Sequence, residues 1–150
     1  MIKIAFIKYG GLASSGTEKF LQNIAMLLPK DQFEVDYYYC DATPYIGSDF
    51  KHPDTDERNI QPMRDAGVTL IKFTVEKKDV TRRDHMWVNS NFFDVFKSNY
   101  YDIIQTGRGG NPEYPVTQIR NTPIIDSIHI MGGIDNQYNI IINTSSALRW

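Results

Sequence analysis

The hydrophobic and polar positions of this chain follow two alternating periods, one typical of strands and one typical of helices. Residues 2–7 form a short, nearly continuous apolar run, as expected for a strand that is buried on both faces. Behind it, apolar side chains recur on one helical face, at Phe20, Leu21, Ile24, Leu27 and Leu28. Pro29 follows directly and ends this run. The opening of the chain therefore predicts a buried strand followed by an amphipathic helix.

The same alternation continues to the end of the chain. Further strands are predicted over residues 33–40, 68–73, 102–106, 123–128 and 139–143. A helix is expected over residues 58–66 with Gly67 as its stop, and another around residues 92–96 behind a cap at Asn89 or Ser90. Residues 41–61 read largely as a polar loop, and residues 76–87 as an irregular, charged segment. Strands that alternate with helices predict an α/β fold: a Rossmann-like, doubly wound, mainly parallel sheet with helices on both faces.

The loop between the first strand and the first helix is the strongest candidate for binding. Gly10 and Gly11 end the strand, since glycine reaches backbone conformations that other residues avoid. Ser15 and Glu18 have capping-box spacing, in which the serine caps the helix and the glutamate reaches back. With Gly16 beside this cap, free N–H groups at the helix start would suit a phosphate or another anion. Neither known glycine-rich nucleotide fingerprint is present, so an ordinary strand-to-helix turn remains the alternative.

Composition narrows the class of protein. A chain of 150 residues is about one domain, and a net charge of −2 gives no sign of a nucleic-acid surface. The single cysteine, Cys40, cannot form an intramolecular disulfide and is expected in the core of a protein from a reducing compartment. No apolar run approaches the roughly 20 residues of a membrane helix, and the N-terminus is a poor signal peptide. We expect a cytoplasmic domain that at most touches the inner face of a membrane.

Segments along the chain resemble motifs of one enzyme family, the GT-B glycosyltransferases of family four. The segment S-G-T-E-K (15–19), followed by N-I-A-M-L-L and F-E-V, is similar to that family's G-G-x-E-R…L-A-x-x-L…H-E-V. Farther along, Y-D-I-I-Q (101–105) is similar to P-D-V-V-H, and P-I-I-D-S-I-H (123–129) to P-V-V-x-T-x-H. The last segment, N-I-I-I-N-T-S (139–145), is similar to D-x-I-I-x-x-S. The chain departs from these motifs at Ser15, Lys19, Gln105 and Asn139.

The resemblance implies a retaining, hexosyltransferase-type enzyme of polysaccharide biosynthesis, built from two facing Rossmann-like halves. Residues 1–150 would be its single N-terminal domain, which binds a glycan, lipid or small-molecule acceptor. The nucleotide-sugar donor, a substrate and not a cofactor, would bind a C-terminal half that carries an E-x7-E motif, which these residues lack. Residues 145–150 look like the beginning of a capped helix, so we expect a fragment that is inactive alone.

The resemblance and the positions of the residues along the chain together select the site residues. His129 ends a predicted strand and matches the family's histidine, which implies a catalytic contact with the transferred sugar; a packed or solvated histidine is the alternative. Arg108 would leave the fourth strand between two glycines and grip a diphosphate or an anionic acceptor, unless it is merely solvated. The remaining expected donor-diphosphate or acceptor contacts are Gly10, Gly11, Ser15, Gly16 and Ser127.

Three other features carry weaker hypotheses. A basic cluster is formed by Lys77, Lys78, Arg82 and Arg83. It would bind anionic lipid headgroups or a lipid-linked pyrophosphate; the alternative is that it is simply a solvent-exposed charged face. Four side chains that can bind metals, His52, Asp54, Asp56 and Glu57, lie in one predicted loop. No predicted helix or strand would position them, so we expect no metal site there. Asp41 follows the second strand, but without a glycine fingerprint it is a poor ribose ligand.

Two rival functions remain open on the sequence. The first is a Rossmann-like nucleotide-binding enzyme that is complete in itself. The second is a non-catalytic binding module of flavodoxin-like shape. The coding sequence beyond residue 150 distinguishes them from the transferase, since a second glycine-rich half of about 200 residues is expected only for the transferase.

Overall fold

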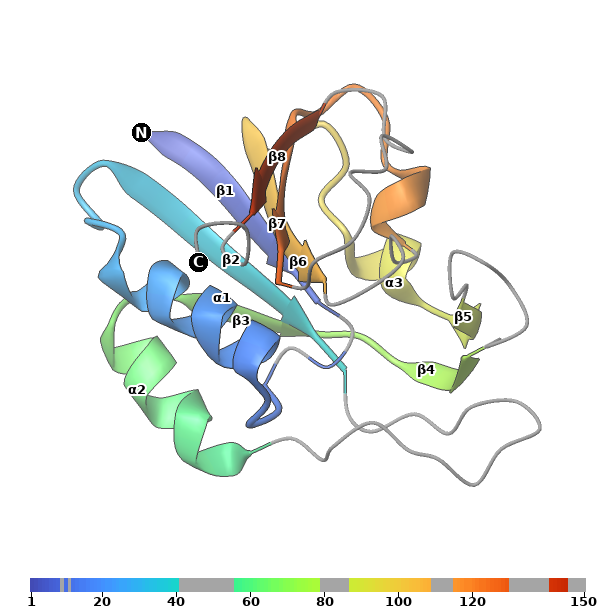
Figure 1. The fold of residues 1–150 in the computed structure, drawn as a ribbon, viewed down its shortest axis with the longest axis horizontal. Helices are drawn as coiled ribbons and strands as arrows, with labels where there is room; N and C mark the ends of the chain where they lie inside the picture. Colours follow the sequence, from blue (N-terminus) through green and yellow to red (C-terminus); the bar gives the residue numbers. More distant parts are fainter. Residues whose placement is uncertain are drawn as a thin grey trace.

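The computed structural model describes residues 1–8, 10, 12–40, 56–78, 87–108, 115–129 and 141–145. Within them lies a six-stranded sheet of order β3-β2-β1-β6-β7-β8, in which every neighbouring pair is parallel (Figure 1). Its strands are β1 Ile2–Ile7, β2 Phe33–Tyr39, β3 Thr69–Lys72, β6 Ile103–Arg108, β7 Ile124–Ile128 and β8 Ile141–Ser145. Each predicted strand corresponds to one of these, and the predicted α/β doubly wound fold is confirmed.

The strand order reverses at β1. The chain runs outward from β1 to β2 and β3, and then returns to place β6 on the other side of β1. Ile4 of β1 faces Ile103 of β6, and Phe6 faces Gln105. In open α/β sheets ligands bind beyond the carboxyl ends of the strands where the order reverses. The loops that follow β1 and β6 therefore flank the expected ligand position.

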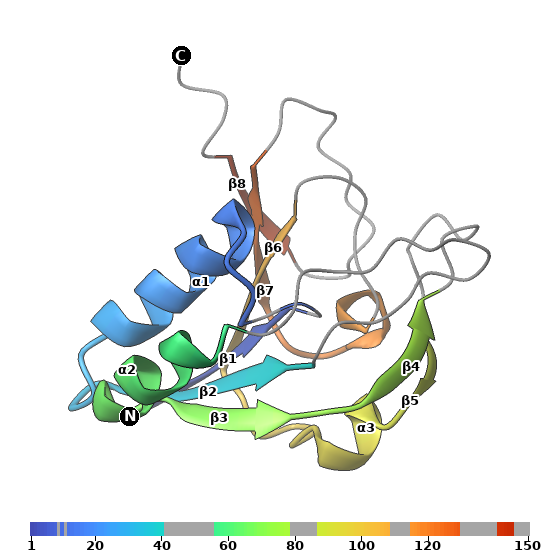
Figure 2. The ribbon, with the colours of Figure 1, turned by 90° about the horizontal axis from the view of Figure 1, so that it is seen from below.

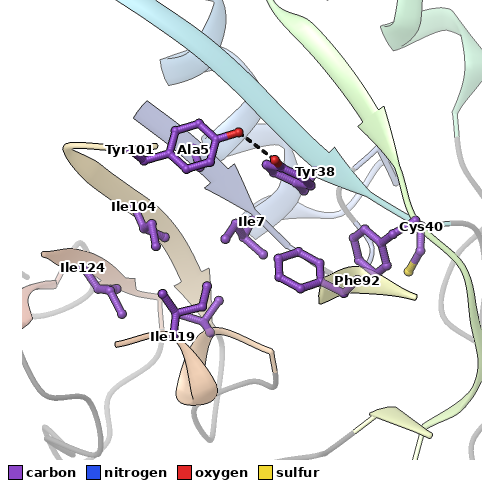
Figure 3. Close-up of a cluster of buried hydrophobic side chains, with 11 residues drawn as sticks. Ala5, Ile7, Tyr38, Cys40, Phe92, Tyr101, Ile104, Ile119 and Ile124 are labelled. Atoms are coloured by element: carbon purple, nitrogen blue, oxygen red, sulfur yellow. Dashed lines mark hydrogen bonds between the residues drawn. The ribbon is translucent and has the colours of Figure 1, made fainter. Parts of the chain in front are cut away.

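Helices cover both faces of the sheet (Figure 2). The helix α1 (Gly16–Leu27), the 3₁₀ turn η1 (Glu57–Asn59) and α2 (Ile60–Asp65) lie over one face. The short α3 (Phe92–Val95) and the turn η2 (Val116–Gln118) lie over the other. Each face has its own core: Leu21, Met63 and Tyr37 belong to the first, and Phe92 and Ile104 to the second (Figure 3). No helix in the described part of the chain is long and apolar enough to cross a membrane.

Local signals in the sequence explain where two helices end. Gly67 follows α2 with φ of 76°, a left-handed conformation that favours glycine, and its N–H donates to the Arg64 carbonyl at 2.9 Å. The predicted stop at Gly67 is therefore confirmed. In α1, Leu28 is the C-cap and leaves the helix in an extended conformation just before Pro29.

Two sequence predictions in the helices need correction. Leu27 was expected on the buried face of α1, but it is 82% exposed. The buried stripe runs through Leu21 and Ala25, and Leu27 lies two positions after Ala25, about 200° around the helix. The helix expected over residues 92–96 is only the four-residue α3; Ser90 does bond it, accepting from the Phe92 N–H at 3.1 Å.

Residues 76–87 were predicted to be irregular, and this is wrong for the part that the structure describes. Val75–Lys78 forms β4 and Trp87–Ser90 forms β5, an antiparallel pair outside the main sheet. Lys77 faces Val88 in this ladder. Strands of four residues give only two alternations of side-chain direction, which is too few to stand out among charged neighbours.

Candidate functional site

Charged side chains are buried where β1, β6 and β7 end and α1 begins. Lys8 follows β1 directly and is 5% exposed, while Glu18 in the first turn of α1 is 3% exposed. Arg108, the last residue of β6, is 3% exposed, and Asp126 of β7 is fully buried. Charged residues are rarely buried unless they are paired. Their concentration at the reversal of strand order identifies this edge of the sheet as the candidate site.

The loop between β1 and α1 is fastened on its inner side. The Ala13 N–H donates to the Gly10 carbonyl at 2.8 Å, and Gln22 of α1 donates its side-chain amide to the Ala13 carbonyl at 3.1 Å. Gln22 is itself buried. The expected binding residue Gly10 is thus a buried member of a tight turn, whereas Gly11 lies outside the described residues.

The turn η1 fastens the same loop from the other side. The Asp56 N–H donates to the Leu12 carbonyl at 2.9 Å, and the Ser14 hydroxyl donates to the Asp56 carboxylate at 2.7 Å. Arg58 also bonds this carboxylate, and its hydrogen bond and then that of Ser14 hold the Asp56 pKa well below its usual range. Hydrogen bonds to η1 and α1 therefore hold residues 12–14 of this loop. Asp56 serves this purpose, and no metal-binding cluster of His, Cys, Asp and Glu occurs among the described residues.

The predicted capping box forms only in part. Ser15 occupies the N-cap position, but its side chain makes no hydrogen bond to the helix backbone. Its hydroxyl donates instead to the Glu18 carboxylate, whose other oxygen lies 3.9 Å from the Lys8 ammonium. Glu18 is turned toward Lys8 because a buried carboxylate needs a cation nearby. The first N–H groups of a helix have no intrahelical partner, and the Ser15 side chain does not cap those of α1.

Gly16 is the first residue of α1, as predicted. Gly16 is exposed, and a Cβ built at this position would meet no atom within 4 Å. The space directly beside the helix start is therefore open to a Cβ.

Arg108 does not stand at a flexible crest. Its Nε donates to the Asp126 carboxylate at 2.7 Å inside the sheet, and both side chains are buried. The prediction failed on this point because the strand extends through Arg108, two residues beyond the predicted end at residue 106. Its charge is compensated by Asp126, so Arg108 links β6 to β7 beneath the site. Its guanidinium group is not exposed as an anion-binding group would be.

Ser127 lies within β7 and is buried. Its hydroxyl accepts from the Gln105 amide at 3.1 Å, and the same amide donates to the Thr106 carbonyl at 2.8 Å. Thr106 in turn donates its hydroxyl to the Ile7 carbonyl at 2.9 Å. This chain of polar contacts runs from β7 across β6 to β1. Ser127 and Gln105 thereby join the strands beneath the site.

His129 follows β7 directly, as predicted, and its N–H donates to the Arg108 carbonyl at 2.9 Å. Its ring packs edge-on against Phe20 of α1, with centroids 4.7 Å apart. Burial lowers the pKa of His129 below its ordinary value, the Lys8 charge lowers it further, and Glu18 opposes this effect. The imidazole is thus partly enclosed between β7 and α1 and is favoured in its neutral form.

Gly107 makes room for this arrangement. A Cβ at Gly107 would lie 3.2 Å from the Thr17 methyl group and 3.4 Å from Nε2 of His129. The first turn of α1 and the histidine ring therefore meet over a strand position that has no side chain. The sequence reasoning missed Gly107, Thr17 and Lys8. The signal for Lys8 was present, because a charged residue directly behind a strand buried on both faces has to be held at its strand end.

Other expected contacts lie outside the site or outside the described residues. Lys77 and Lys78 belong to β4, while Arg82, Arg83, Asp41, His52 and Asp54 are not described. A pocket of about 160 Å³ on the opposite face is lined by Phe93, Phe96, Ile119, Arg120 and neutral polar side chains. Its lining contains no acid–base pair, so it does not rival the strand ends as a site of chemistry. Comparison of this chain with family models, with curated protein sequences and with solved structures finds no match.

Proposed function

We propose that this chain is the N-terminal, acceptor-binding domain of a retaining glycosyltransferase that uses a nucleotide-sugar donor. The observation that carries the proposal is the meeting of His129 with the first turn of α1 at the reversal of strand order. Thr17 and His129, which both lie next to Gly107, belong to two segments, residues 15–19 and 123–129, whose sequences resemble the motifs of that enzyme family. The segments lie more than one hundred positions apart and still share one site.

The reaction requires a position for the diphosphate and a group that contacts the transferred sugar, and this site has a candidate for each. Retaining transfer passes through an oxocarbenium-like state while a nucleoside diphosphate departs, so it depends on positioning and on electrostatic stabilisation. The start of α1 has open space beside Gly16 and helix N–H groups that the Ser15 side chain does not cap. Backbone donors and the positive end of the helix favour a diphosphate there.

His129 supplies the second requirement. A neutral imidazole has one N–H donor and one acceptor nitrogen, so it can bond a sugar hydroxyl in either direction. Burial and the neighbouring Lys8 both favour this neutral form. We assign to His129 the contact with the transferred sugar. In this proposal Ser127, Gln105 and Arg108 hold the strand ends that carry His129.

The donor half lies, in this proposal, in sequence that follows residue 150. The described chain offers an acceptor side and one wall of the donor site. The nucleotide would be held largely by the second domain, together with the acidic E-x7-E motif. The chain alone is then expected to bind nucleotide sugars weakly or not at all.

The strand order favours one other function. The sheet reverses at β1 as mononucleotide-binding sheets do, and this reversal also suits a nucleotide-binding enzyme that is complete within these residues. The two functions differ in a simple way. A self-contained enzyme binds its nucleotide without any further domain.

The test begins with the coding sequence beyond residue 150. A second Rossmann-like half supports the transferase, and its product is then assayed for nucleoside-diphosphate release from UDP- and GDP-sugars. We expect His129→Ala to lower turnover by roughly 100-fold or more, the usual loss for one transition-state hydrogen bond. Phe93→Ala, on the other face of the sheet, is the control and should keep full activity.

Two results would overturn the proposal. One is a coding sequence that stops at residue 150, together with micromolar binding of a nucleotide by this chain in calorimetry. The other is a full-length enzyme whose turnover survives His129→Ala while its melting temperature falls. The latter would make His129 a packing residue.

A further inference from the structure

We propose that Lys8 and Glu18 are positioning residues of this site, a buried ion pair that holds the start of α1 to the end of β1 beside the His129 ring and places two opposite charges near that ring. The functional importance of this inference rests on the proposed role of His129. The effect of the pair on protonation of the His129 ring can be measured without any substrate. Neither residue belongs to the contacts that the sequence predicted.

The burial of the pair is the first argument. The Lys8 ammonium lies 3.9 Å from Glu18, and both side chains are 4% exposed. Removing two charges from water costs several kcal/mol per ion, and imperfect geometry does not fully repay that cost. The Ser15 hydroxyl adds a hydrogen bond to the carboxylate but leaves the separation long. A pair of this kind is a poor source of stability, which points to a role in the site.

The location of the pair is the second argument. Glu18 stands in α1 between Thr17, which approaches the ring over Gly107, and Phe20, which packs against the ring edge. Lys8 stands at the end of β1, the strand at which the order reverses. The carboxylate therefore fastens the first turn of α1 to the end of β1. This turn carries the side chains that hold the ring in place.

The charges around the ring give the third argument. Lys8 acts on His129 from β1 and Glu18 acts on it from α1. Arg108 of β6, whose carbonyl accepts from the His129 N–H, and Asp126 of β7 bond to each other at 2.7 Å, so their charges largely cancel. Burial is the main cause of the lowered His129 pKa, and to it the charges of Lys8 and Glu18 add opposite effects. Lys8 disfavours an imidazolium more than Glu18 favours it.

The consequence is a neutral histidine in a site that receives an anion. A departing diphosphate would by itself attract a proton onto a nearby imidazole. The Lys8 ammonium opposes that uptake, and the Glu18 carboxylate lies beside Lys8 inside the fold. His129 then remains both a donor and an acceptor during the reaction.

The experiment is an NMR titration of the His129 ring proton, assigned by its absence in His129→Gln. In the unaltered chain we expect the midpoint below the ordinary histidine value of 6.5. Lys8→Met should raise the midpoint and Glu18→Gln should lower it. Lys19→Met is the matched control, because it removes the same charge from α1 at a residue that bonds Asn59 at 2.8 Å. It should leave the midpoint unchanged.

Single variants of a buried pair can fail to fold, so the double variant Lys8→Met/Glu18→Gln removes both charges together. Because the Lys8 effect outweighs that of Glu18, its midpoint should lie above that of the unaltered chain. Equal midpoints in the unaltered chain and in the double variant would overturn the inference. A midpoint at or above 6.5 in the unaltered chain would do the same without any variant.

These outcomes are independent of the proposed function. Shifted midpoints in a protein that transfers no sugar would leave the ion-pair inference intact and remove the transferase. An active transferase whose midpoint ignores Lys8 and Glu18 would remove the inference alone.

Discussion

The phenolic oxygens of Tyr38 and Tyr101 lie 2.6 Å apart in the core, and this contact joins β2 to the residue that leads into β6 (Figure 3). Tyr101 donates its own proton to the Asp36 carboxylate, also at 2.6 Å, so Tyr38 is the donor between the two tyrosines. Lys97 closes the network with an ion pair to Asp36 at 2.7 Å. Burial is the main cause that raises the pKa of each tyrosine, so both hydroxyls stay protonated.

Tyr101→Phe should destabilise the fold by about 1–3 kcal/mol, because it removes one partner from Tyr38 and one from the buried Asp36 carboxylate. Urea unfolding measures the loss. Tyr100→Phe is the matched control, since its hydroxyl bonds Glu34 in a half-buried position, and it should cost less. Equal losses in the two variants would show that the buried network contributes nothing beyond an ordinary hydrogen bond.

Gly107→Ala should destabilise the chain by about 1–3 kcal/mol, the usual cost of overpacking, since the new Cβ meets the Thr17 methyl group at 3.2 Å. Adding Thr17→Ser removes that methyl group and should restore much of the stability. The new Cβ would lie 3.4 Å from Nε2 of His129, an ordinary van der Waals distance, so this second contact should add little to the loss of stability. Stability that does not recover in the double variant would contradict the assigned contact.

Gly16→Val should keep the stability of the chain, because the space beside Gly16 is open and valine is a better helix former than glycine. In the full-length enzyme the same change should raise the donor KM or cut turnover. A kinetic comparison of the two enzymes checks this. Unchanged kinetics would reduce the start of α1 to an ordinary turn.

Ser15→Ala separates a stability effect from a binding effect. Its hydroxyl donates to the buried Glu18 carboxylate, and hydrogen bonds to charged groups contribute about 1.5–3 kcal/mol. The melting temperature should therefore fall whether or not a ligand is present. Ser14→Ala, which loses a bond to Asp56 in an exposed position, should cost less. A larger loss from Ser14 would reverse the assigned importance of the two serines.

Stability should also depend on pH through His129. Its folded pKa lies below the ordinary 6.5, so below pH 6.5 the unfolded chain binds a proton that the folded chain does not. The free energy of unfolding should then fall as the pH drops from 6.5 toward the folded pKa. The difference between the unaltered chain and His129→Gln, followed by urea unfolding across this range, isolates the effect. A constant difference would mean that the ring titrates equally in both states.

The sequence predicted the fold well because central strands such as β1 are largely buried and read as continuous apolar runs. Ile2–Ile7 matches its predicted bounds fully. The prediction failed where neighbours in space decide the outcome. Leu27 continues an apolar pattern that the sheet does not reach, and Ser15 forms a contact with Glu18 where a backbone cap was expected.

The sequence indicated which residues lie at the candidate site but not which side chains pair with one another inside it. His129 and Gly16 were identified because each stands at the end of an element whose period is clear. Pairing was invisible, however, since Arg108 meets Asp126 and Lys8 meets Glu18 only after parallel strands and α1 come together. Nothing in linear spacing distinguishes an arginine that grips a ligand from one that serves a buried aspartate.

The reversal of strand order at β1 has a consequence for how the chain is made. The hydroxyl of Thr106 in β6 reaches the Ile7 carbonyl of β1 across 99 positions of sequence. A ribosome that adds about 5–20 residues per second needs roughly 5–20 seconds to supply that partner. Throughout this interval one edge of the apolar β1 strand stands open on the nascent chain. Such an edge is a template for pairing with other chains, so slow translation of residues 8–103 should favour aggregation over folding.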